Sequence, residues 1–118
     1  MKTAIVMGGA IGVWEEYERA REVLPEAFVV ATNHAGRDAP FHVDHWCSVH
    51  GDLMNKWHSQ RIEAGRTVGT VWTAKGPWKG NKMPMRRLKY RGGSSGLLAV
   101  DVALYEGAER VLLVGMPM

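Results

Sequence analysis

The chain has 118 residues, 46% hydrophobic and 23% charged, a composition that is ordinary for one soluble globular domain and too short for a second core. No apolar run reaches the roughly 20 residues that cross a bilayer, and the single cysteine, Cys47, excludes an internal disulfide. The net charge of +3 hides an asymmetry, since residues 65–100 hold eight bases and no acid while the rest has seven bases and twelve acids.

The first 24 residues predict a strand, a glycine turn and a helix. Residues 2–7 are an apolar run, glycines at 8, 9 and 12 follow, and an apolar stripe with helical spacing covers residues 13–24. The glycine spacing departs from the dinucleotide-binding fingerprint, and no acid stands at the end of the second strand. A nicotinamide cofactor is therefore not expected.

Residues 27–32 predict a second buried strand, with Asn33 and His34 at its carboxyl end. Ligands bind at this edge of an open α/β sheet, so Asn33 is either a hydrogen-bonding group for a base or ribose, or a turn residue that tolerates the left-handed conformation. Residues 33–36 are read as a turn, and residues 37–40 predict a polar connection.

Residues 43–49 predict a third strand, with His50 at its ligand-facing end. Three histidines, Cys47 and Asp44 lie within nine residues, but the alternation of a strand divides them between its two faces. We therefore expect no metal site, and Cys47 is interpreted as a core residue.

A helix over 51–64 and a strand over 67–73 come next. Asp52 is expected to cap the helix, and its inward side chains are expected to be Leu53, Met54, Trp57 and Ile62.

Residues 75–91 predict a long irregular basic loop, because proline and glycine interrupt it. We expect it to be mobile until it binds an anion, since its charges repel one another. Trp78 and Tyr90 could also stack on a nucleobase, although no RNA-binding motif accompanies them.

The stretch from Arg91 to Gly115 predicts a loop, a helix and a strand. Glycine and serine residues over 92–96 start a helix at 95–106, which is expected to be largely buried, and residues 111–115 predict a strand covered on both faces. Unpaired N–H groups, hydroxyls and the helix dipole at Ser94, Ser95 and Gly96 suit a phosphate. The alternative is a capped helix with no ligand.

Together these elements predict one α/β domain over residues 1–118. We expect a Rossmann-like three-layer sandwich, with an open and mostly parallel sheet of about five strands and helices on both faces.

These residues resemble the Rossmann-like, nucleotide-binding domain of bacterial sialyltransferases and related phage and bacterial proteins, including motility-associated ones. The resemblance rests on the turn after the first strand, Asn33 after the second, the late Ser-Ser-Gly helix start and the Val-Gly-Met strand end. It implies a CMP-type nucleotide or nucleotide-sugar donor. The contacting residues would be Gly8, Gly9, Asn33, Ser94, Ser95, Gly96 and Arg91.

The chain departs from this family at its C-terminal end. The catalytic histidine and the phosphate-binding tyrosines of the sialyltransferases follow the last strand found here, yet this sequence stops at Met118. Transfer would need another base, for which His34 and His50 are the candidates, or there is no transfer reaction. Whether the chain is an enzyme, of the glycosyltransferase type, stays open at this point.

Two functions follow from the sequence. The first is a cytoplasmic protein that binds a nucleotide or another phosphate-bearing small molecule. The second is a phage-derived structural or interaction protein, located in the host cytoplasm or the virion, whose basic loop contacts an acidic partner or nucleic acid. Exposed sheet edges also make a homodimer plausible.

Overall fold

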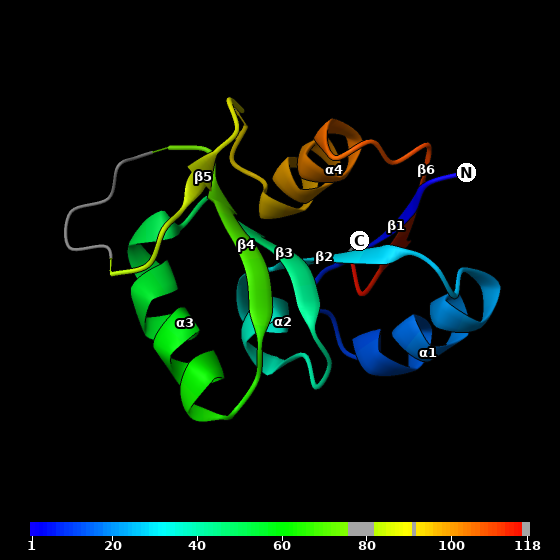
Figure 1. The fold of residues 1–118 in the computed structure, drawn as a ribbon, viewed down its shortest axis with the longest axis horizontal. Coiled ribbons are helices and arrows are strands. Elements are labelled where there is room, and N and C mark those ends of the chain that lie inside the picture. Colours follow the sequence, from blue (N-terminus) through cyan, green and yellow to red (C-terminus); the bar gives the residue numbers. More distant parts are fainter. Residues whose placement is uncertain (76–81, 91, 117–118) are drawn as a thin grey trace.

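The computed structural model describes residues 1–75, 82–90 and 92–116, and within these ranges the strands form one parallel sheet (Figure 1). The strand order is β5-β4-β3-β2-β1-β6. In chain order the elements are β1 (Thr3–Met7), α1 (Val13–Val23), β2 (Phe28–Thr32), α2 (Asn33–Asp38), β3 (Val43–Ser48), the 3-10 helix η1 (Gly51–Leu53), α3 (Met54–Glu63), β4 (Val68–Thr73), β5 (Arg86–Arg87), α4 (Ser95–Tyr105) and β6 (Arg110–Val114).

The sheet lies between two layers of helices, with α1, α2 and α3 on one face and α4 on the other (Figure 1). The two cores follow the alternation of the strands. In β1, Ile5 and Met7 pack in the core that contains α1 and α3, whereas Ala4 and Val6 pack beneath α4. The predicted α/β class and the Rossmann-like three-layer arrangement are therefore confirmed.

The chain changes direction across the sheet between β1 and β6. It steps from β1 to β4 in one direction, and α4 then returns it to pair β6 with the other side of β1. The crossover from β1 to β2 passes through α1 on one face of the sheet, whereas the crossover that ends in β6 passes through α4 on the other face. This is the kind of switch point at which open α/β sheets bind ligands.

Two stretches that were predicted to be irregular have regular structure. Residues 33–38 form the helix α2 rather than a turn and a polar connection. In the predicted basic loop, residues 86–87 form β5, and Met83 and Met85 pack against the core. Met83 and Met85 stand among proline and basic residues and form no periodic apolar pattern, so the sequence did not predict their contacts with the core. Residues 76–81 and Arg91, which belong to the same predicted loop, lie outside the described residues.

The burial of three predicted elements was overestimated. In α4, the side chains of Leu97 and Leu104 are exposed, because only one side of this helix packs against the sheet. The strand β6 lies at the sheet edge and exposes Leu113. Two residues expected to face inward near α3 are also exposed, namely Leu53 and Ile62. The N-cap residues of η1 and α3 are His50 and Leu53, and neither makes a side-chain cap, so the expected cap from Asp52 is wrong.

Within the described residues, no helix is both long and apolar enough to span a bilayer.

Candidate functional site

Asn33 occupies a special position at the carboxyl end of β2. Its φ of 48° makes it the only described residue other than glycine in the left-handed region, a conformation that asparagine tolerates better than most residues. The indole Nε1 of Trp46 donates a hydrogen bond of 2.9 Å to the Asn33 carbonyl oxygen. The backbone is therefore held where strand passes directly into α2.

The side-chain oxygen of Asn33 is the centre of a polar network. Ser48 Oγ and Ser95 Oγ both donate to Asn33 Oδ1, at 2.7 and 3.3 Å. The serine oxygens in turn accept from backbone N–H groups, Ser48 from His50 at 2.9 Å and Ser95 from Val49 at 3.0 Å.

This network orients the Asn33 amide. Its oxygen accepts from both serines, so its other atom, Nδ2, is the one left to donate. Within the part of the chain that the structure describes, Nδ2 donates to no acceptor. The arrangement leaves a positioned donor at the ligand-binding edge of the sheet.

The two serines of the late loop have different roles. Ser94 is the N-cap of α4, and its exposed side chain accepts from the Leu97 N–H at 3.3 Å. Ser95 is buried, and its hydroxyl donates a hydrogen bond to Asn33 Oδ1. The backbone N–H groups of Ser95 and Gly96 have no acceptor among the described residues. The start of α4 thus offers two N–H groups and the Ser94 hydroxyl.

Met116 connects the glycine turn after β1 with the start of α4. A Cβ at Gly8 would clash with the Gly115 carbonyl and lie 3.0 Å from the Met116 sulfur, and one at Gly96 would lie 3.5 Å from the same sulfur. The Gly115 N–H donates to a carboxylate oxygen of Glu16 at 2.8 Å, which fixes this loop.

A cavity of about 240 Å³ lies beside this network, between the glycine turn and α2. Its lining includes Gly9, Trp14, His34 and Asp38. His34 packs against the Trp57 ring edge at 5.0 Å between centroids and is otherwise exposed. The hydrogen bond from Arg37 lowers the pKa of Asp38, so this carboxylate is ionised at neutral pH.

The structure thus brings most of the predicted site residues to one edge of the sheet. Asn33 and Ser95 are hydrogen-bonded, Gly8 and Gly96 border the same sulfur, and Ser94 adjoins them. The backbone N–H of His50 donates to Ser48 Oγ of the network, whereas the His50 side chain is exposed.

Other predicted residues have different positions. His34 and Gly9 line the neighbouring cavity, and Arg91 lies outside the described residues. Sequence reasoning missed Ser48 and Met116. A serine at the end of a buried strand was the available signal for Ser48, whereas nothing in the sequence places Met116 between two glycines.

Comparison with family models, curated proteins and solved structures finds no match to this chain.

Proposed function

We propose that the carboxyl edge of the sheet binds a nucleotide or nucleotide sugar, as the resemblance to the sialyltransferases implies. The observation that supports this most is the Asn33–Ser48–Ser95 network, which leaves Asn33 Nδ2 without a partner among the described residues. A positioned amide donor at this edge suits a carbonyl oxygen of a base or a ribose hydroxyl.

In this proposal the phosphate binds at the start of α4. The Ser94 hydroxyl and the N–H groups of Ser95 and Gly96 donate to phosphate oxygens, and the helix dipole favours the negative charge. The sequence led us to expect a phosphate contact from the Ser95 hydroxyl, and the present proposal gives this group a positioning role instead. It donates to Asn33 and accepts from Val49, so it positions the amide instead of contacting phosphate.

If the protein transfers a sugar, His34 is the preferred base. It lines the cavity beside the network, where an acceptor hydroxyl has room, and the Asp38 carboxylate lines the same cavity. A base near the acceptor and donors on the departing phosphate are the two requirements of such a reaction. Binding without transfer needs only the Asn33 network and the start of α4.

Calorimetric titration with CMP, UMP and their sugar conjugates tests the proposal. In Ser94→Ala, we expect nucleotide affinity to fall by about tenfold, because a hydrogen bond to a charged group is worth about 1.5–3 kcal/mol. The lost cap also lowers stability by about 1 kcal/mol, which thermal unfolding measures separately. Ser59→Ala, at an exposed serine of α3, is the control and should change neither quantity.

Ser95→Ala separates positioning from phosphate contact. The variant leaves the Val49 N–H without its partner and frees the Asn33 amide, so stability should fall by about 1–3 kcal/mol. Affinity for nucleosides lacking phosphate should fall together with affinity for nucleotides, whereas Ser94→Ala should weaken only the phosphorylated ligands. A wild-type protein that binds none of these ligands, or an unchanged affinity in Ser94→Ala, would refute the proposed site.

A further inference from the structure

The outer edge of β4 is only partly covered by another strand. β5 pairs with β4 at Trp72 and Thr73 alone. Along residues 68–71, β4 pairs with no strand on that side in the described part of the chain, while β3 pairs with its other side. An uncovered strand edge presents backbone N–H and C=O groups that another extended chain can pair with.

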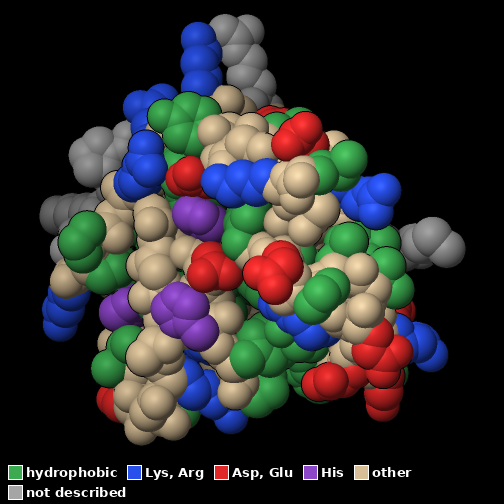
Figure 2. Space-filling model, turned by 45° about the vertical axis from the view of Figure 1, so that its right-hand side comes forward, with side chains coloured by type: hydrophobic (Ala, Val, Ile, Leu, Met, Phe, Trp, Pro, Cys, Tyr) green, Lys and Arg blue, Asp and Glu red, His purple; other side chains and the backbone are tan. Residues whose placement is uncertain are grey.

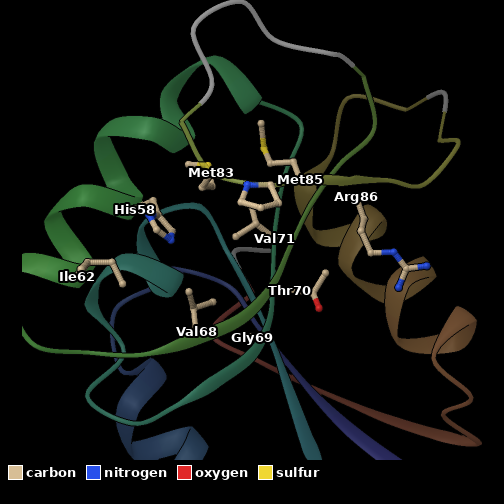
Figure 3. Close-up of a pocket in the computed structure, with 10 residues that line it drawn as sticks. His58, Ile62, Val68, Gly69, Thr70, Val71, Met83, Met85 and Arg86 are labelled. Carbon is tan, nitrogen blue, oxygen red and sulfur yellow. The ribbon is translucent and has the colours of Figure 1, made fainter.

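A cavity of about 330 Å³ lies against this edge. It is bounded by β4, by α3 and by the segment that leads into β5 (Figure 3). His58 and Ile62 of α3 lie on one side and Met83 on another, with Val68 and Val71 of β4 between them (Figure 3). The walls are mostly apolar and flexible, so the cavity suits one apolar side chain of a strand added to β4.

Basic side chains predominate around β5, beside this edge. Residues 65–100 contain no acid, and the described bases of β5 and its flanks, Lys75, Lys82, Arg86, Arg87 and Lys89, are all exposed. Only Arg86 among these described bases has an ion pair, with Glu106 at 3.6 Å. Figure 2 shows Lys and Arg side chains projecting at the top of the molecule and several acids at the lower right, with both signs of charge elsewhere on this face. A partner for the β4 edge is therefore expected to be acidic.

We propose that the β4 edge binds an acidic, extended segment of a partner protein. The segment adds as a strand along residues 68–71, inserts an apolar side chain into the cavity and directs its carboxylates toward the bases of β5. Single-stranded nucleic acid fits these observations less well, because stacking needs exposed aromatic rings and His58 is the only aromatic residue among those that line the cavity. This site is separate from the proposed nucleotide site.

Titration of the ¹⁵N-labelled protein with a panel of synthetic peptides tests the proposal. Each peptide has about eight residues in which Asp or Glu alternates with an apolar residue, and the central apolar residue is Val, Leu, Met or Phe. We expect saturable NMR shift changes in residues 68–71, in α3 and around β5. The same peptides with lysine in place of the acids should not bind. Saturable shifts elsewhere, none with any acidic peptide, or tighter binding of oligothymidine at the same residues would overturn the proposal.

Two variants with matched controls test the cavity and the charge. Ile62→Glu places a carboxylate at the cavity, and we expect peptide affinity to fall by about tenfold or more. Leu53→Glu, at a residue of similar exposure outside the cavity, should leave affinity unchanged. Arg87→Glu should weaken binding by a few-fold and reduce its salt dependence, whereas Arg19→Glu on α1 should not. Equal affinities in Ile62→Glu and Leu53→Glu would contradict insertion into the cavity.

Discussion

At the scale of single residues, Arg61 of α3 is a charged side chain that is buried in the folded protein. Its side chain is fully buried, and its guanidinium donates to the carbonyl oxygens of Gly36, Ala39, Phe41 and Thr67. The planar fork of an arginine matches several acceptors at once, as no other side chain does. Arg61 therefore ties α3 to the end of α2 and to the chain leading into β3 and β4.

Removing this guanidinium should destabilise the protein strongly. In Arg61→Met, the buried carbonyls of Gly36 and Ala39 lose their donors, so we expect the free energy of unfolding to fall by about 3 kcal/mol or more. Urea unfolding of the variant and the wild type measures this change in the free energy of unfolding. The control is Arg66→Met, which loses one exposed bond to the Asp38 carbonyl and should change stability by about 0.5 kcal/mol or less. Similar unfolding midpoints for both variants would show that Arg61 has no such role.

At the scale of elements, the position of α2 depends on a glycine. A Cβ on Gly36 would collide with the ring of Trp46, so the missing side chain allows the helix to lie directly on the indole. Trp46 is fully buried and also holds the Asn33 carbonyl at the start of α2. The helix that carries His34 to the candidate site is thus positioned by packing against β3.

Gly36→Ala should therefore destabilise the protein, although alanine favours helices more than glycine does. We expect a loss of about 1–3 kcal/mol, as for other overpacked cores, because Trp46 cannot move without breaking its bond to Asn33. Gly9→Ala is the control, since a Cβ there meets no atom within 4 Å. Thermal unfolding of the two variants compares them, and a Gly36→Ala protein as stable as Gly9→Ala would refute close packing of α2.

At the scale of the whole molecule, the dependence of stability on pH involves a histidine inside the sheet. His45 Nδ1 accepts a hydrogen bond of 3.0 Å from Trp72 Nε1, a bond that requires this nitrogen to be unprotonated. Burial lowers the pKa of His45, and nearby Glu106 opposes this shift. The folded protein thus favours the neutral ring more than the unfolded chain does.

The sign of the effect follows from linkage. Because the pKa is lower in the folded state, the unfolded state binds more protons below pH about 6.5, and the stability present above that pH is lost as pH falls through the folded pKa. We expect the free energy of unfolding to decrease between pH 7 and 5, measured by urea unfolding. His45→Gln keeps an acceptor for Trp72 but cannot titrate, so its profile should be flatter. Identical slopes would assign the pH dependence to other groups.

The sequence by itself determined the α/β class and the main strands and helices. Apolar runs and stretches rich in β-branched and aromatic residues mark strands locally, so β1 to β4, β6 and the three longer helices were located to within a residue or two, apart from the start of α3. The sequence also predicted that Asn33, Ser94, Ser95 and the glycine turn lie at one edge of the sheet, because the carboxyl ends of parallel strands meet there.

Only the tertiary structure decided which polar atoms of these residues are already hydrogen-bonded within the protein. The Ser95 hydroxyl donates to the Asn33 side chain. The two residues are 62 positions apart in the sequence, so no local pattern encodes this contact. The burial of Arg61, the helix at Gly36 and the short strand β5 likewise depend on partners distant in the chain. Local chemistry specifies where elements begin and end, whereas exposure and hydrogen-bonding capacity belong to the packed molecule.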